Sequence, residues 1–265
     1  MEASDARTHL GPAGGRRPRT TAHPGHLAGY ARKAERLGFA EVWVAEDCFL
    51  HGAFAQAATI LASTTSPQVG MGIIPAAARN VAFAALEIAT LAGMRPGWLA
   101  VGVGHGMPGW LDQAGAQPSS PLTLLEEYIQ ALRWLLAGQR VDYAGHYVRL
   151  SGVQLSHAPP VFAGVRGPPV FAGVRGPRSL RLSSKIAQGT ILAEPVTPEY
   201  LSLVAKQVNS RRSPGHRPAG RGDAEPDDRC VRAGFRVIGD DVARGAGLAA
   251  ADGQHRGLGG RDLPG

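Results

Sequence analysis

The sequence contains very little cysteine and very little lysine. Its two cysteines, Cys48 and Cys230, form no CxxC pair and match no metal-ligand spacing. We therefore expect neither a disulfide framework nor a metal site, and we predict a cytoplasmic protein. All three lysines lie between residues 33 and 206, whereas arginine occurs along the whole chain. No apolar run approaches the roughly 20 residues of a membrane span, and no apolar signal-peptide segment opens the chain, so no membrane partner is expected.

Motifs for catalysis by protein side chains are also missing. The chain has no Walker A sequence, no HExxH, no Ser-His-Asp order and no pair of carboxylates at a catalytic spacing. We therefore expect any chemistry to be supplied by an organic cofactor, with the catalytic residues unknown.

The positive charge does not point to a nucleic acid. The net charge is +7 and the pI is about 10.0, but much of the excess lies in terminal segments that are also rich in glycine and proline. No basic helix, aromatic-interleaved basic stripe or zinc-finger spacing accompanies it. We expect solvated, disordered ends and no nucleic-acid partner.

The middle of the chain alternates between strand and helix patterns, whereas the two ends show neither period. Residues 1–23 and 209–265 are predicted to be disordered, and the second segment is alternatively interpreted as out-of-frame sequence. Residues 24–208 alternate short apolar strands with helices, which is typical of a parallel α/β sheet. The pattern alone fits a barrel and an open doubly wound sheet equally well. Strands are expected at 41–45, 69–74, 99–103, 170–172 and 190–193, helices at 24–37, 54–63, 81–94, 122–136, 178–187 and 198–208, and a hairpin at 141–150.

One nonapeptide occurs twice in succession. PPVFAGVRG spans Pro159–Gly167 and again Pro168–Gly176. This period is far shorter than the roughly 20–50 residues of repeat folds, so it indicates a local duplication. We predict that one copy occupies a strand of the sheet and that the other bulges out as a loop.

Residues that follow the expected strands are candidates for binding, because active sites of parallel α/β barrels form at the carboxyl ends of the strands. Asp47 follows the first strand and either accepts a hydrogen bond from a ligand or caps a helix. The run Gly102–Gly106 has the spacing G-x-G-x-G, which is not the Rossmann spacing, but glycine lets a flat ring approach the backbone. His105, within this run, either donates to a cofactor carbonyl or is an ordinary loop histidine.

Two further connections are candidates for contacts with a cofactor. In Ile74–Asn80 the small residues would allow a planar ring to approach, although an ordinary loop is the simpler interpretation. The segment Ala172–Pro177 leads into a helix whose first N–H groups suit a phosphate. Arg175 or Arg178 would add charge-assisted contacts; the alternative is a tight connection with surface arginines.

Four stretches together resemble the luciferase-like monooxygenase superfamily, which includes deazaflavin-dependent methylenetetrahydromethanopterin reductases. They are AERLGFAEVWVAED at 34–47, the glycine-rich segment at 86–116, the helix and hairpin at 122–155, and the strand-helix-strand unit at 169–192. The resemblance implies an incomplete (β/α)8 TIM barrel over residues 24–208. Because the expected first and last strands are replaced by unrelated sequence, truncation or a frameshift at both ends is a further hypothesis.

The resemblance also implies the cofactor and its site. FMN or the reduced deazaflavin coenzyme F-420 would bind across the carboxyl rim of the barrel. The implied cofactor-binding residues come from four strand ends: Asp47; Ile74, Pro75 and Ala76; Gly104, His105 and Gly106; and Ala172, Gly173, Val174 and Gly176.

The function implied is that of a flavin- or deazaflavin-dependent oxidoreductase or monooxygenase acting on a small organic substrate. Hydride would move between the reduced cofactor and that substrate, or oxygen would be activated. The competing hypothesis is a catalytically inactive remnant of the family, because the barrel would lack strands at both ends. A homodimer is left open as the assembly.

Overall fold

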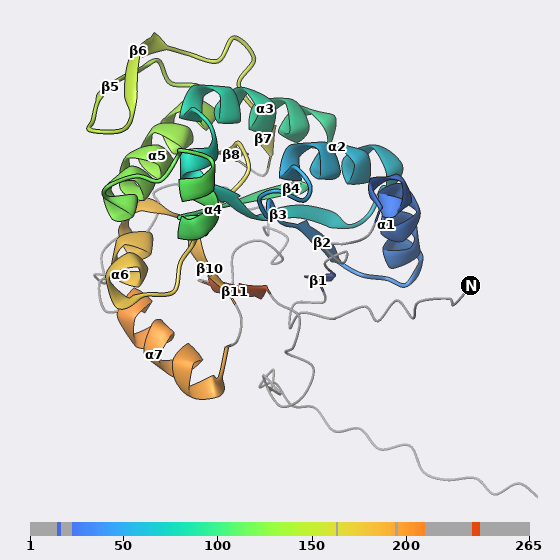
Figure 1. The fold of residues 1–265 in the computed structure, drawn as a ribbon. Helices are drawn as coiled ribbons and strands as arrows, with labels where there is room; N and C mark the ends of the chain where they lie inside the picture. Colours follow the sequence, from blue (N-terminus) through green and yellow to red (C-terminus); the bar gives the residue numbers. More distant parts are fainter. Residues whose placement is uncertain (1–14, 17–22, 163, 194–195, 210–234, 239–265) are drawn as a thin grey trace, which may run out of the picture.

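The computed structural model describes residues 15–16, 23–162, 164–193, 196–209 and 235–238. Its centre is a seven-stranded parallel sheet in the order β1-β2-β3-β4-β9-β10-β11 (Figure 1). The strands are β1 (Gly15–Arg16), β2 (Glu41–Val44), β3 (Gln68–Pro75), β4 (Leu99–Gly104), β9 (Val170–Gly173), β10 (Gly189–Ala193) and β11 (Phe235–Ile238).

Helices cover the outer face of this curved sheet (Figure 1). A doubly wound sheet reverses its strand order at a switch point, whereas here the order follows the chain from one edge to the other. This order settles the alternative left open by the sequence, and it confirms the expected incomplete (β/α) barrel. The helices are α1 (Leu27–Arg36), α2 (Ala53–Ser63), α3 (Val81–Met94), α4 (Pro108–Gln113), α5 (Pro121–Leu136), α6 (Pro177–Ile186) and α7 (Pro198–Asn209), with 3-10 turns η1 (Pro24–His26) and η2 (Ala76–Ala78).

Most helices bury the stripe that their sequence predicts. In α1, Leu27, Ala31 and Ala34 are buried at helical spacing. Leu37, which the helix expected at 24–37 included, is 56% exposed. This expectation was wrong because α1 ends at Arg36 and Leu37 leaves the helix at φ −84°, ψ 3°.

The sheet separates two apolar clusters. The larger cluster lies between the sheet and its helices and includes Val42, Met71, Val101 and Leu132. A smaller cluster on the other face consists of Trp43, Ala100, Phe171 and Ile191, with Ile73 packed against it.

Glycines on the smaller side make room for these bulky residues. A Cβ on Gly70 would overlap the Trp43 ring, and one on Gly102 would lie 2.8 Å from the Met71 carbonyl oxygen. Strand β3 also shifts its register against β4 between Met71 and Ile74. The packing of the smaller cluster therefore requires glycine at these two strand positions.

The two copies of the nonapeptide adopt different structures, as predicted. The second copy supplies β9, between β4 and β10. The first copy forms a short antiparallel hairpin of β7 (Val161–Phe162) and β8 (Val165–Arg166). A second hairpin, of β5 (Val141–Ala144) and β6 (Arg149–Val153), follows α5 as expected.

Two short strands lie outside the predicted range 24–208. β1 pairs with β2 at one edge of the sheet, and β11 pairs with β10 at the other. The remainder of the two terminal segments lies outside the described residues, so the predicted boundaries stay a prediction. Among the helices described, none is long and apolar enough to cross a membrane.

Candidate functional site

Three of the expected strand ends meet at the carboxyl rim of the sheet. Gly104, the last residue of β4, pairs with Pro75 of β3 on one side and with Gly173 of β9 on the other. Gly106 follows at φ +76°, where an added Cβ would lie 2.9 Å from Pro75 Cβ. Segments distant in the sequence therefore form one continuous surface, which we call the β4–β9 rim (Pro75, Gly104–Gly106 and Gly173–Gly176).

The glycines of this rim are explained by Ile73. A Cβ on Gly104 would lie 2.7 Å from Ile73 Cδ1 and 2.8 Å from the Gly173 carbonyl oxygen, and a Cβ on Gly173 would overlap Ile73 Cγ2. The approach of a flat ring to the backbone at these glycines stays a prediction. The space on their side-chain face is occupied by Ile73.

His105 connects the rim to two helices. Its Nδ1 lies 3.2 Å from the Pro121 carbonyl oxygen and its Nε2 lies 3.2 Å from Ser179 Oγ. A carbonyl oxygen only accepts, so Nδ1 carries the proton and Nε2 accepts from the Ser179 hydroxyl. Burial lowers the pKa of His105, and the hydrogen bond to Pro121 opposes this shift.

Both ring nitrogens of His105 are thus engaged by the protein. One interpretation of His105 was that it donates a hydrogen bond to a cofactor carbonyl. In this arrangement it has no N–H available for that bond. The histidine instead joins the loop after β4 to the starts of α5 and α6. It holds Gly104–Gly106 beside the first turn of α6.

The start of α6 forms the end of the same rim. Gly176 is its N-cap residue and Pro177 its first residue, and no side chain caps the first turn. Proline has no N–H to satisfy at that position. The next N–H groups carry the partial positive charge of a helix N-terminus, and the exposed side chain of Arg178 lies in the same turn.

The rim of β2 and β3 is organised by charge instead. Glu46, two residues after β2, receives two hydrogen bonds from Arg79, with Nη1–Oε2 at 2.6 Å and Nη2–Oε1 at 2.7 Å. The Arg79 guanidinium also lies 4.4 Å from the centre of the Phe54 ring. The hydrogen bonds that Arg79 donates to Glu46 raise the pKa of Arg79, against the effect of burial. We call the surface formed by Glu46, Phe54 and Arg79 the β2–β3 rim.

The comparison with known families identifies the chain. Residues 6–241 match the family model described as luciferase-like monooxygenase. The chain belongs to the luciferase-like monooxygenase family. This confirms the resemblance noted from the sequence.

Similar proteins of known name are longer than the part that this chain matches. The chain is 28% identical over 204 residues to the 5,10-methylenetetrahydromethanopterin reductase of Methanolobus tindarius, covering 76% of this chain and 58% of the relative. The coenzyme F420 dependent tetrahydromethanopterin reductase from Methanopyrus kandleri aligns with a TM-score of 0.64 at 20% identity, over 77% of this chain and 60% of that structure. A riboflavin lyase solved with modified FMN and riboflavin aligns at 0.61 and 14% identity, over 77% and 57%. The chain thus spans about three fifths of these luciferase-like relatives.

Not every residue implied by the family resemblance faces the rim. Ile74, Ala76, Ala172 and Val174 are buried in the cluster between sheet and helices, so their side chains are core residues. Asp47 is half-buried after β2, and its carbonyl oxygen accepts from the Leu50 N–H at 2.8 Å. The structure brings Pro75, Gly104, His105, Gly106 and Gly173 together.

Sequence reasoning missed two residues near the β2–β3 rim of this luciferase-like chain. Arg79 was noted only as part of the loop Ile74–Asn80. The signal that could have indicated the ion pair is an arginine and a glutamate that follow neighbouring strands. Tyr128 on α5 is 1% exposed, and its hydroxyl has no hydrogen-bond partner among the described residues. Burial raises the pKa of this hydroxyl, and Arg79 and Glu46 both contribute charge nearby. No sequence signal singled it out.

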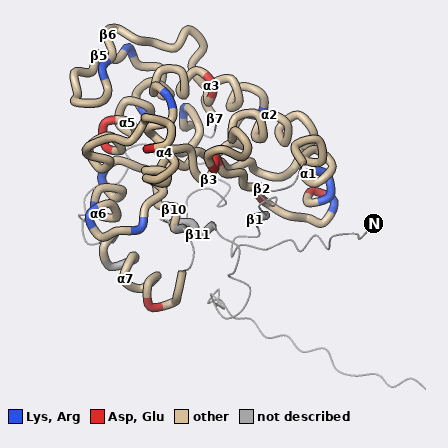
Figure 2. Tube along the Cα trace, viewed as in Figure 1, with Lys and Arg blue, Asp and Glu red and all other residues tan. Residues whose placement is uncertain are grey.

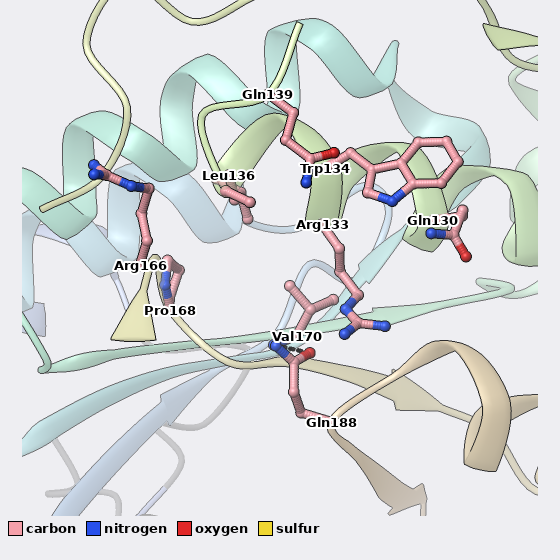
Figure 3. A pocket seen from close by; sticks show the side chains of 10 residues that line it. Gln130, Arg133, Trp134, Leu136, Gln139, Arg166, Pro168, Val170 and Gln188 are labelled. Atoms are coloured by element: carbon pink, nitrogen blue, oxygen red, sulfur yellow. Dashed lines mark hydrogen bonds between the residues drawn. The ribbon is translucent and has the colours of Figure 1, made fainter. Parts of the chain in front are cut away.

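A separate pocket lies at the opposite end of the sheet. It has a volume of about 290 Å³ and lies between the end of α5 and the start of β9 (Figure 3). The lining includes Arg133, Arg166 and Gln188 but no acidic residue.

Figure 2 shows lysine and arginine spread over several helices of the described chain. Within the described residues, no three histidine, cysteine, aspartate or glutamate side chains are grouped to hold a metal.

Proposed function

We propose that this chain is a cofactor-dependent oxidoreductase whose site is the β4–β9 rim. The cofactor would be deazaflavin F420 or FMN, and the substrate a small organic molecule. The bound cofactor supplies the hydride chemistry, while the protein orients it and excludes water. The observation that carries the proposal is the His105–Ser179 contact, which joins the glycine loop after β4 to the first turn of α6.

The residues present suit the phosphate of either cofactor. The first N–H groups of α6 have no side-chain cap, and such a helix start attracts anions through its N–H donors and its dipole. Arg178 in that turn adds a positive charge. Gly176 ahead of the helix leaves the approach unobstructed, since an added Cβ there would meet no atom within 4 Å.

The deazaflavin is the favoured cofactor. The Methanopyrus kandleri reductase, which shares the fold, is described as coenzyme F420 dependent, and the Methanolobus tindarius relative is a 5,10-methylenetetrahydromethanopterin reductase. The riboflavin lyase, also of this fold, is described with modified FMN, so FMN is the second candidate.

Spectroscopic titration of the purified chain with F420 and, separately, with FMN tests the proposal. We expect saturable binding of one cofactor. Arg178→Ala should weaken it by roughly 2–10-fold, the effect of one partly exposed charge-assisted contact. Arg181→Ala, an exposed arginine further along the same helix, is the matched control and should leave affinity unchanged. Absence of binding to both cofactors by folded protein would overturn the proposal in favour of an inactive remnant.

A further inference from the structure

The duplicated nonapeptide gives the central strand β9 two equivalent sources. The identity extends over ten residues, because Pro168 follows the first copy and Pro177 follows the second. Moving the chain by nine residues would place Val161 where Val170 now lies, and Gly164 where Gly173 lies. Every side chain of the strand would be preserved.

The contacts that hold β9 are made by atoms that both copies possess. Pro169 and Val170 accept backbone hydrogen bonds from Val101 and Gln188, and the Val174 N–H donates to Ile191. Phe171 packs in the inner cluster. Pro160, Val161, Phe162 and Val165 carry the same groups at the same spacing.

The route of the preceding chain also allows the exchange. The first copy begins and ends beside one turn, since a Cβ on Gly138 would lie 3.1 Å from Ala158 Cβ and 3.6 Å from Arg166 Cδ. Arg166 Nη1 donates to the Pro159 carbonyl oxygen at 3.0 Å, which closes the same loop. Residue 158 therefore already lies close to the point where the second copy enters the sheet.

The geometry points to two interchangeable registers for this chain. In the first, which is the one described, Pro168–Gly176 forms β9 and the spare copy is the β7–β8 hairpin. In the second, Pro159–Gly167 forms β9 and Pro168–Gly176 becomes a nine-residue insertion between the strand and α6. The register is chosen as the chain folds, because exchange in the folded protein would require removing a strand from between β4 and β10.

The free-energy difference between the registers lies in the spare copy alone. As a hairpin it gains a short ladder between Val161–Phe162 and Val165–Arg166, and Phe162 covers Gly97. Val161, Phe162 and Val165 nevertheless remain 53–59% exposed. Arg166, which lines the pocket of Figure 3, would leave that wall in the second register, and Pro159 would take the place of Pro168. The insertion would move to the β4–β9 rim, beside Ser179.

The Gly173→Val variant tests whether the chain can adopt only the described register or both registers. In the described register this valine overlaps Ile73, whereas in the second register Gly164 takes the position and the valine lies in the insertion. The double variant Gly164→Val/Gly173→Val has no acceptable register and should lower Tm by about 4–10 °C, from the usual cost of overpacking. We expect the single variant Gly173→Val to lose less than half of that.

Two controls isolate the effect. Gly164→Val alone places the valine in the turn of the hairpin, at φ +77°, and its small Tm loss is subtracted from that of the double variant. A chain shortened by nine residues is identical whether Pro159–Gly167 or Pro168–Gly176 is removed. That chain holds only one nonapeptide, so a glycine-to-valine substitution there cannot be moved out of β9. The resulting Tm loss should match that of the double variant.

Hydrogen exchange with mass spectrometry identifies the strand directly. In the Gly173→Val variant the two copies differ in mass. We expect the first copy, which keeps Gly164, to be protected and the second copy, which carries the substitution, to exchange rapidly. Protection that stays on the substituted copy would overturn the proposal. So would a Tm, or a loss of folded protein, equal to that of the double variant.

Discussion

The two rims of this sheet are held by different kinds of interaction. On the β2–β3 rim, the two loops are joined by a charged pair, Glu46 with Arg79, whose side chains are 11% and 26% exposed. On the β4–β9 rim, the loops are joined by the uncharged imidazole of His105, and glycines accommodate Ile73. The first rim therefore depends on keeping both charges, whereas the second depends on His105 staying neutral.

Removing one member of the charged pair should have the largest effect. Arg79→Met leaves the Glu46 carboxylate partly buried without its partner, and we expect a loss of about 1–3 kcal/mol of unfolding free energy, between the values for surface and buried pairs. Chemical denaturation measures it.

The control for this prediction is Arg79→Met combined with Glu46→Gln. The second change removes the stranded charge, so the double variant should recover at least part of the stability. A double variant that is the sum of two independent losses would show that the pair does not hold the β2–β3 rim.

Breaking the uncharged connection should have a smaller effect. His105→Ala removes hydrogen bonds to Pro121 and Ser179, for an expected loss of about 1–2 kcal/mol. Ser179→Ala keeps the Pro121 bond and should lose about half as much. Equal stability of His105→Ala and the parent would mean that His105 does not connect the rim to α5 and α6.

The two rims should also differ in how their stability depends on pH. Because burial lowers the pKa of His105, the unfolded chain takes up a proton below the ordinary value of about 6.5 while the folded chain resists it. The stability due to neutral His105 is therefore complete above that pH and is lost as the pH falls through the lowered pKa. Denaturation at pH 7.5 and 5.5 should show the parent losing more stability than His105→Asn. The same loss in both proteins would assign the pH dependence to other groups.

The smallest effect is expected at Tyr128, behind the β2–β3 rim. Its buried hydroxyl has no partner among the described residues, so Tyr128→Phe removes a polar group without breaking a hydrogen bond. We expect unchanged or slightly raised stability, by about 1 kcal/mol or less. A loss above that range would reveal a partner, such as a buried water, that joins Tyr128 to Arg79 and Glu46.

The sequence predicted the succession of elements well because amphipathic and apolar periods are local properties. Helix α3 has the predicted bounds, 81–94, and α5 begins one residue earlier than expected, at Pro121. The short helix α4 was missed, because six residues are too few to establish a period.

The orientation of the site residues was less predictable. The resemblance implies positions, but the register shift of β3 between Met71 and Ile74 decides which side chains face outward. Ile74 and Ala76 consequently belong to the helix-side core. The strand expected at 170–172, in the second nonapeptide, is confirmed as β9, although the two copies have identical residues and therefore identical propensities. Their different structures come from tertiary contacts.

Hydrogen exchange of the parent chain with and without F420, and with and without FMN, tests the assignment of the site most directly. We expect a bound cofactor to slow exchange in residues 104–107 and 174–180, at the β4–β9 rim. Residues 133–139, at the pocket on the opposite end of the sheet, should be unaffected. Slowed exchange confined to residues 133–139, or no change with either cofactor in folded protein, would contradict the assignment.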